Sequence, residues 1–129
     1  MTKKIPPVLL VEDDVRLLEQ MKGALEDEGF QVHTAAGCEE ATTVLAETEF
    51  SLVITDLHLP DGNGMDVLES VQATTSPLPV LVITAYASID TAVEAMKRGA
   101  FHYLPKPISL DTLLVQIEKA LEHGAALRE

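Results

Sequence analysis

One short segment sets the pattern for the whole chain: Val8-Leu9-Leu10-Val11-Glu12-Asp13-Asp14. Its four apolar residues are uninterrupted and mostly branched, which is typical of a β-strand covered on both faces. Asp14 can then cap a helix, because apolar residues follow it at helical spacing as far as Gly29, a residue type that commonly ends helices. The segment therefore predicts a buried strand, an acidic turn and a helix.

The same alternation of an apolar run and a helical pattern recurs four more times along the chain. Helical crossovers between strands bring those strands together as a parallel sheet with helices on both faces. We therefore predict an α/β fold, a doubly wound five-stranded parallel sheet of the (βα)₅ type. The further strands are predicted at residues 30–35, 52–55, 80–83 and 101–104, the further helices at about 39–47, 65–71, 89–96 and 110–121, and a turn at 59–64.

The length of 129 residues corresponds to one ordinary domain. We assign residues 7–122 to this domain and residues 1–6 to an N-terminal tail. Residues 123–129 are predicted to form a tail or the start of a linker.

Composition argues against several classes of function. The 21 acidic and 9 basic residues give a net charge of -12, which disfavours direct binding to nucleic-acid phosphates. No apolar run approaches the roughly 20 residues that cross a bilayer, and the first residues lack a signal-peptide pattern. A single cysteine fits a reducing compartment. We therefore expect a cytoplasmic protein without membrane contact.

Four of the five predicted strands end beside a polar residue with useful chemistry. In an open parallel sheet, ligands bind beyond the carboxyl ends of the strands, at the point where the strand order reverses. Crowded carboxylates repel one another, by roughly 4 kcal/mol per pair at 4 Å and an effective dielectric constant of 20, and a hard divalent cation such as Mg²⁺ relieves this. The residues concerned are Glu12 and Asp13 after the first strand, Asp56 after the third, Thr84 at the fourth, and Lys106 after the fifth.

Each of these residues also has an ordinary interpretation when taken alone. The acids near residue 12 could complement a helix dipole, Asp56 could be a turn residue, and Lys106 could be a solvated loop charge. Their joint placement at one edge of the predicted sheet favours a functional site.

The segments Val8–Asp14, Val53–Gly62, Val82–Ala85 and Tyr103–Pro107 closely resemble the receiver domains of two-component response regulators. The resemblance covers residues 7–121 and includes four motifs in order. It implies the flavodoxin-like strand order 2-1-3-4-5, which makes the first and third strands neighbours.

The resemblance implies a role for each matching residue. Asp56 corresponds to the phosphoacceptor, Asp13 to the carboxylate that binds Mg²⁺ directly, and Glu12 to an acidic neighbour that acts through water. Glu12 departs from the more frequent Asp, so its path to the metal is longer. His58 would lend only its backbone carbonyl to the metal. The remaining implied features are Thr84, which contacts the phosphoryl group, Lys106, which pairs with a phosphoryl oxygen, Tyr103, which changes rotamer with Thr84, and a cis peptide bond at Lys106-Pro107.

The resemblance also implies a function. A sensor histidine kinase or a phosphotransfer protein would supply the phosphoryl group to Asp56 in an Mg²⁺-dependent reaction. The chain would not be an enzyme but a phosphoacceptor signalling domain that assists its own phosphorylation and dephosphorylation. Phosphorylation would switch the surface formed by the fourth helix, fifth strand and fifth helix, and it would allow a phosphorylation-dependent homodimer.

Transcription is the expected output, because the segments around residues 84–107 look most like receivers joined to ATPase-type activators of transcription or to small DNA-binding domains. Contact with DNA would occur only through an output domain that is not in this chain.

Two further residues are expected to tune the lifetime of the phosphoryl group. In the family that the chain resembles, the residues two past the acceptor and two past the threonine flank the phosphoryl group, and here these are His58 and Tyr86. Both are bulky rings, and we expect them to obstruct the path of attacking water. The alternative is that both rings point to solvent and have no effect.

Three other functions remain to be weighed. A haloacid-dehalogenase-type phosphatase would need Asp-x-Asp, whereas this chain has Asp56-Leu57-His58. A nucleotide- or flavin-binding module would need a glycine-rich loop after the first strand, where the chain has none. A degenerate receiver that only docks to partners would lack some of the reactive residues, whereas here all of the positions are filled.

Overall fold

The structure is a computed structural model that describes residues 5–73 and 78–128. Its main feature is a five-stranded sheet in which every neighbouring pair of strands is parallel. The spatial order is β2-β1-β3-β6-β7, which is 2-1-3-4-5 when only the strands of this sheet are counted. The predicted doubly wound fold is therefore confirmed. The strands are β1 (Val8–Val11), β2 (Val32–Ala35), β3 (Leu52–Asp56), β6 (Val80–Thr84) and β7 (His102–Pro105).

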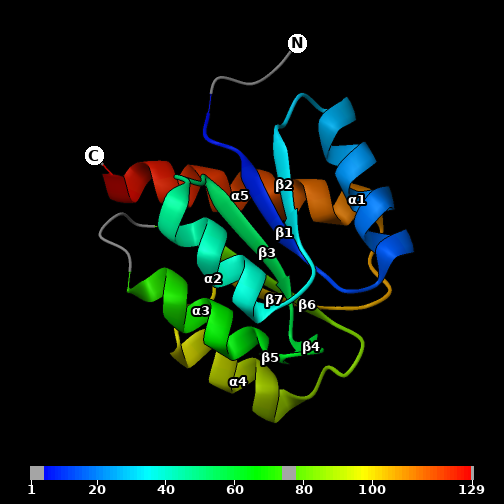
Figure 1. Cartoon of the computed structure of the whole chain (residues 1–129), viewed down its shortest axis with the longest axis vertical. Coiled ribbons are helices and arrows are strands. Elements are labelled where there is room, and N and C mark those ends of the chain that lie inside the picture. The colour runs from blue at the N-terminus through cyan, green and yellow to red at the C-terminus, as the bar shows by residue number, and fades with distance from the viewer. Residues whose placement is uncertain (1–4, 74–77, 129) are drawn as a thin grey trace.

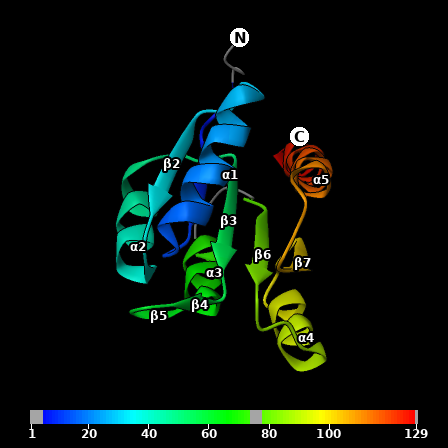
Figure 2. The same cartoon turned by 90° about the vertical axis from the view of Figure 1, so that its right-hand side faces the viewer.

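Helices cover both faces of this sheet (Figures 1 and 2). The helices α1 (Val15–Asp27) and α5 (Leu110–Arg128) pack on one face. The opposite face carries α2 (Cys38–Glu47), α3 (Gly64–Gln72) and α4 (Ile89–Lys97). The central strands separate two apolar cores, which explains why their residues are apolar without alternation. In β1, for example, Val8 and Leu10 contribute to the core under α1 and α5, whereas Leu9 and Val11 contribute to the other.

The predicted helix boundaries have clear physical causes. The carboxylate of Asp14 accepts hydrogen bonds from the backbone N–H groups of Arg16 and Leu17, at 3.1 and 3.3 Å. Gly29 ends the first helical segment with a positive φ of 94°, a conformation that favours glycine. The Ser88 side chain caps α4 by accepting a hydrogen bond from the Thr91 N–H. The expected cis bond at Lys106-Pro107 is also confirmed.

The structure adds detail to the prediction in three places. The second strand, predicted at 30–35, begins at Val32. Within the predicted turn, β4 (His58–Leu59) and β5 (Gly62–Asn63) form a small antiparallel pair. The helix α5, predicted to about residue 121, continues to Arg128, and the assignment of residues 123–129 to a tail or the start of a linker stays a prediction. Gly124 is buried, and a Cβ atom at this position would lie 3.1 Å from Cδ of Pro79. Residues beyond 122 thus pack closely against Pro79.

In the part of the chain that the structure describes, no helix combines the length and apolar character that a membrane span requires. Pro77, which precedes the predicted fourth strand in the sequence, lies outside the described residues.

Candidate functional site

The register of the sheet brings the polar strand ends together. Val11 lies opposite Thr55, so the next residues, Glu12 and Asp56, are neighbours at the edge. In the same way, Asp56 pairs with Ile83, one residue before Thr84. Thr84 in turn lies opposite Pro105, one residue before Lys106. The four predicted polar positions thus converge because parallel strands end at the same edge.

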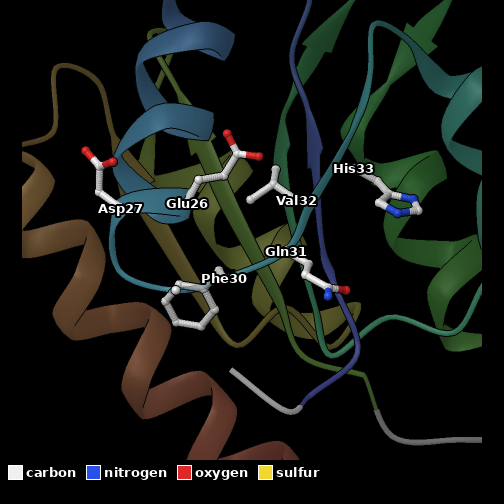
Figure 3. A pocket seen from close by; sticks show the side chains of 7 residues that line it. Glu26, Asp27, Phe30, Gln31, Val32 and His33 are labelled. Carbon is white, nitrogen blue, oxygen red and sulfur yellow. The ribbon is translucent and has the colours of Figure 1, made fainter. Parts of the chain in front are cut away.

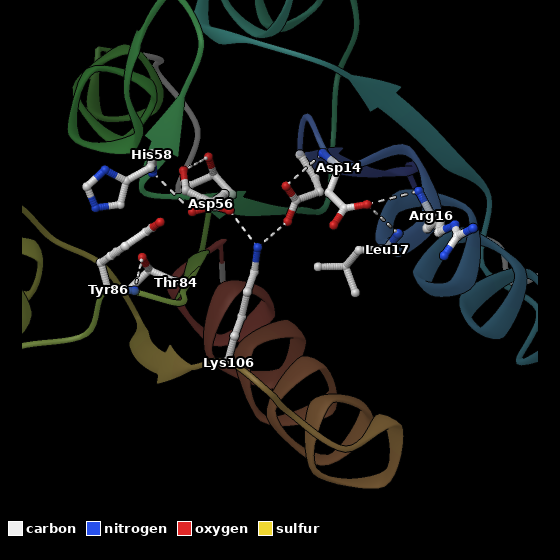
Figure 4. A network of polar contacts seen from close by, with 10 residues as sticks. Asp14, Arg16, Leu17, Asp56, His58, Thr84, Tyr86 and Lys106 are labelled. Carbon is white, nitrogen blue, oxygen red and sulfur yellow. Dashed lines mark hydrogen bonds and ion pairs between the residues drawn. The ribbon is translucent and has the colours of Figure 1, made fainter.

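Lys106 connects two of these carboxylates (Figure 4). Its Nζ atom donates to Oε1 of Glu12 at 2.5 Å and to Oδ2 of Asp56 at 2.6 Å. All three side chains are largely withdrawn from solvent, with exposed fractions of 17% for Lys106, 6% for Glu12 and 9% for Asp56. Charged hydrogen bonds in such surroundings are stronger than exposed ion pairs, so Lys106 holds the acceptor carboxylate in a defined orientation.

Burial and hydrogen bonding have opposite effects on the pKa values of Glu12 and Lys106. Burial raises the pKa of the Glu12 carboxyl, although the hydrogen bond from Lys106 opposes that effect. For Lys106, burial acts to lower the pKa, but the hydrogen bonds to Asp56 and Glu12 outweigh it, and the pKa of the ammonium is raised. Lys106 therefore keeps its positive charge at neutral pH.

Asp13 completes a cluster of three carboxylates. One oxygen from each of Glu12, Asp13 and Asp56 lies within 4.8 Å of the others, and Asp13 is exposed. A hard cation such as Mg²⁺ prefers oxygen ligands and usually takes only one or two carboxylates together with water. The donor set therefore fits a divalent cation that is reached from solvent.

His58 and Tyr86 lie near the acceptor and contact each other. The backbone N–H of His58 donates to Oδ1 of Asp56 at 3.0 Å, and the N–H of Tyr86 donates to Oγ1 of Thr84 at 3.1 Å. The rings of His58 and Tyr86 meet edge to face, with centroids 4.6 Å apart and planes at 70°. Figure 4 shows both rings beside Asp56, while Lys106 approaches from another direction. His58 is exposed and Tyr86 is 70% exposed, so the structure leaves open both the expected effect on phosphoryl lifetime and the alternative in which the rings point to solvent without effect.

Tyr103 is engaged elsewhere. Its hydroxyl is hydrogen-bonded to Oγ1 of Thr91 in α4, at 2.5 Å, and its ring packs against the core beneath α2, α3 and α4. The paired rotamer change of Thr84 and Tyr103 stays a prediction, as does the role of the His58 carbonyl. Sequence reasoning does not single out Thr91, because a threonine in a helix carries no signal of a partner twelve residues away.

Two further residues that the sequence did not assign shape the loop after Asp56. A Cβ atom on Gly64 would lie 2.4 Å from the carbonyl oxygen of Asp56, so the start of α3 can approach the acceptor only with glycine there. The carboxylate of Asp61 accepts hydrogen bonds from the N–H groups of Cys38 and Glu39, at 2.7 and 3.0 Å. These bonds lower the pKa of Asp61 and cap α2 from the acceptor loop. The density of turn residues at 59–64 was the only available sign of both contacts.

A separate groove of about 500 Å³ lies at the other end of the sheet (Figure 3). It is formed where α1 ends and β2 begins, whereas the predicted site lies beyond the carboxyl ends of the strands. Its lining residues are Glu26, Asp27, Gly29, Phe30, Gln31, Val32 and His33, none of which belongs to the predicted site.

The fold and the site together define a doubly wound α/β domain with a lysine-bridged aspartate and an acidic cluster at the switch point of its sheet. Comparison with known proteins agrees with this class. The sequence profile of the response regulator receiver domain matches residues 8–118. This chain therefore belongs to the response regulator receiver domain family.

Curated relatives are longer proteins. The chain is 40% identical over 115 residues to the alginate biosynthesis transcriptional regulatory protein AlgB of Pseudomonas aeruginosa, a match that covers 89% of this chain and 26% of AlgB. It is 37% identical over 116 residues to the transcriptional regulatory protein ZraR of Escherichia coli strain K12, covering 90% of this chain and 26% of ZraR. The chain thus spans about a quarter of the length of these relatives.

Solved receiver structures superpose closely. The beryllofluoride-activated NtrC4 receiver domain dimer has a TM-score of 0.86 and 34% identity, covering 91% of this chain and 97% of that chain. A CheY-like receiver domain protein from Methanospirillum hungatei JF-1 has a TM-score of 0.90 and 30% identity, with coverages of 95% and 98%.

Proposed function

We propose that Asp56 accepts a phosphoryl group from a phosphohistidine on a sensor histidine kinase or a phosphotransfer protein. The observation that carries this proposal is the buried Asp56 carboxylate, which is held by Lys106 Nζ and the His58 N–H beside two further acids. A carboxylate oxygen is a competent nucleophile when its orientation is defined and its product is stabilised.

The phosphoryl group passes directly from a histidine nitrogen to a carboxylate oxygen. An oxygen of Asp56 forms a bond to phosphorus as the bond from phosphorus to the histidine nitrogen breaks, and the leaving imidazole takes up a proton from water. Lys106 is charged and turns from the carboxylate toward the phosphoryl oxygens, whose charge it stabilises. Thr84 accepts a hydrogen bond from Tyr86, and its hydroxyl proton remains to be donated to a phosphoryl oxygen.

Glu12, Asp13, Asp56 and the carbonyl of His58 would hold Mg²⁺. The ion, when bound, neutralises negative charge on the phosphoryl group. In this proposal the domain is a phosphoacceptor that assists its own phosphorylation and dephosphorylation, rather than an enzyme acting on a separate substrate.

Intact-mass spectrometry after incubation with acetyl phosphate and Mg²⁺ tests the proposal. Wild type should gain one phosphoryl group, and Asp56→Asn should gain none. The matched control is Asp66→Asn, an exposed acid at the start of the neighbouring helix, which should behave like wild type. A chelator should prevent the reaction. Equal modification of wild type and Asp56→Asn would disprove the assignment.

We further propose that the output is transcription and that the active form is a homodimer. Both AlgB and ZraR are named as transcriptional regulatory proteins, and the NtrC4 receiver is described as an activated dimer. In this chain α4 exposes Ile89, Val93 and Met96 at helical spacing, next to the edge strand β7. Contact with DNA would come through an output domain outside these 129 residues, and the location would be the cytoplasm.

Sedimentation with and without beryllofluoride, a phosphoryl mimic, tests the dimer. The mimic should shift wild type from monomer toward dimer, whereas Val93→Asp should stay monomeric while still binding the mimic. A matched control is Val15→Asp, an exposed valine on α1, which should dimerise like wild type. Dimerisation of Val93→Asp at the wild-type level would exclude this surface.

A further inference from the structure

The segment that follows the acceptor strand folds back on itself as a small hairpin, residues 58–63. Its two arms are β4 and β5, and Pro60 and Asp61 lie at its tip. At its opposite end, the N–H of His58 donates to Oδ1 of Asp56 at 3.0 Å (Figure 4). A change in the position of the 58–63 hairpin therefore moves the peptide group that contacts the acceptor carboxylate.

The helix α2 is capped by this hairpin and not by its own N-cap residue. That residue is Gly37, which has no side chain that could accept a hydrogen bond. Instead, the Asp61 carboxylate accepts from the N–H groups of Cys38 and Glu39, at 2.7 and 3.0 Å. Each carboxylate oxygen binds a different amide, so the position and the orientation of the Asp61 side chain are both defined. The tip of the hairpin is thus tied to the N-terminus of α2.

Gly37 makes this contact sterically possible. Its backbone is extended, with φ of −166°, a conformation that any residue adopts. A Cβ atom at this position would nevertheless lie 2.5 Å from Oδ1 of Asp61. Glycine is therefore needed here for the approach of the carboxylate and not for the backbone conformation.

The helix α2 is a suitable support because its own apolar residues attach it to the sheet. Ala41 is buried, and Val44 and Leu45 pack against the same core. The hairpin contributes Leu59 to that core, but its tip is exposed to solvent. The position of the tip therefore depends on polar contacts, chiefly those of Asp61.

We propose that Asp61 is a positioning residue for phosphoryl transfer to Asp56, because it ties the 58–63 hairpin to α2 and so fixes the His58 peptide group against the acceptor carboxylate. This inference rests on the proposed phosphorylation of Asp56. Asp61 does not touch the reacting atoms and acts only through the hairpin. Transfer depends on how well the nucleophilic oxygen is oriented, so a less constrained His58 peptide group slows the reaction.

The first test is the rate of phosphorylation by acetyl phosphate with Mg²⁺, followed by intact-mass spectrometry at a temperature where every variant is folded. Asp61→Ala should slow the reaction about five-fold, as expected for the loss of charged hydrogen bonds that orient the site. The rate of Asp61→Asn, which keeps one accepting oxygen, should lie between those of wild type and Asp61→Ala.

Glu40→Ala is the matched control. The Glu40 carboxylate accepts from the Ala36 N–H at 2.9 Å, so it supports the same end of α2 from within the helix and not from the hairpin. Glu40→Ala should lower the thermal midpoint but leave the phosphorylation rate at the wild-type value. A rate that only followed stability would fall in both Asp61→Ala and Glu40→Ala.

Gly37→Ala breaks the same contact from its other side. The added Cβ atom displaces the Asp61 carboxylate while residue 61 stays unchanged. Gly37→Ala should slow phosphorylation as Asp61→Ala does, and the double variant should be no slower than Asp61→Ala, because both changes remove one contact. If Asp61→Ala fails to fold, Gly37→Ala and Asp61→Asn carry the test.

The second test is hydrogen exchange of the His58 amide, measured by NMR on the unphosphorylated protein. This amide should exchange about five-fold faster in Asp61→Ala and in Gly37→Ala than in wild type, because its bond to Asp56 opens more often when the hairpin is released. In Glu40→Ala its exchange should match wild type. Unchanged exchange in Asp61→Ala would show that Asp61 does not fix the His58 peptide group.

Failure of this inference and failure of the proposed function give different results. If Asp61→Ala is phosphorylated at the wild-type rate, or if Glu40→Ala slows the reaction equally, the positioning role is wrong while the proposed function stands. If wild type gains no phosphoryl group, or if Asp56→Asn gains one equally, the proposed function fails and the positioning role fails with it.

Discussion

The loops that follow the neighbouring strands β3 and β6 are built in different ways. After β3, Asp61 caps α2, the Gly64 N–H donates to the Leu57 carbonyl at 2.7 Å, and α3 is deeply buried. After β6, Tyr86 is 70% exposed and Ile89 is 83% exposed. In the proposed function the first loop orients a reacting carboxylate, which requires fixed geometry, whereas the second leads to the helix that is expected to respond. The difference in burial between the two loops agrees with this division of roles.

The largest effect is expected from filling the space at Gly64. Gly64→Ala places a Cβ atom 2.4 Å from the Asp56 carbonyl oxygen and 2.9 Å from Leu57 Cα, so the backbone of the acceptor loop must shift. Unfolding by urea should show a loss of about 1–3 kcal/mol, and phosphorylation by acetyl phosphate should slow.

The control for Gly64 is Gly23→Ala in α1, where no atom lies within 4 Å of the added Cβ. This change should stabilise the domain by about 0.5–1 kcal/mol, because alanine favours helix more than glycine does. Equal effects of the two substitutions would mean that the acceptor loop is not tightly constrained.

The next effect concerns the ring pair that connects the two loops. Because His58 and Tyr86 contact each other, we expect them to obstruct water together and to prolong the phosphoryl lifetime. His58→Ala and Tyr86→Ala should each speed single-turnover dephosphorylation several-fold, and the double variant should be little faster than either one. Tyr86→Phe keeps the ring contact and serves as the control. Unchanged rates in both alanine variants would show that lifetime is set by other residues.

A smaller effect should follow from loss of the Asp61 carboxylate, which connects the loop after β3 to the first turn of α2. The pKa of Asp61 is lowered by its hydrogen bonds, so its contribution to stability is present above its ordinary value of 3.8 and is lost as pH falls through the lower folded value. Asp61→Ala should reduce the thermal midpoint at pH 7, and its deficit relative to wild type should shrink below about pH 3.8. The thermal midpoint of Asp61→Asn, which keeps one accepting oxygen, should lie between those of wild type and Asp61→Ala. A deficit independent of pH would show that the charge of Asp61 is not involved.

The smallest effect should distinguish two adjacent acids by sign. Without divalent ions, Asp13→Ala should raise the thermal midpoint slightly, because it removes repulsion from Glu12 and Asp56. Asp14→Ala should lower stability by about 1 kcal/mol, because it removes the cap of α1. A clear drop in midpoint for Asp13→Ala would instead make Asp13 a structural residue.

The amino-acid sequence alone predicts the order of strands and helices and most of the polar residues at the sheet edge. Apolar runs, helical spacing and turn residues are local signals. The segment from β1 to Asp13, for example, shows a buried strand and the acidic residues that follow it within six residues. Because parallel strands end at one edge, the convergence of Asp56, Thr84 and Lys106 also follows from order alone.

Several contacts depend instead on how the finished elements pack. Lys106 reaches Glu12 across 94 residues of sequence, and Asp61 caps a helix that begins 23 residues before it. The bond between Thr91 and Tyr103 likewise requires α4 and β7 to lie side by side. No local pattern encodes such pairs, because the distance between two side chains from separate elements is set only when those elements are packed against a common core.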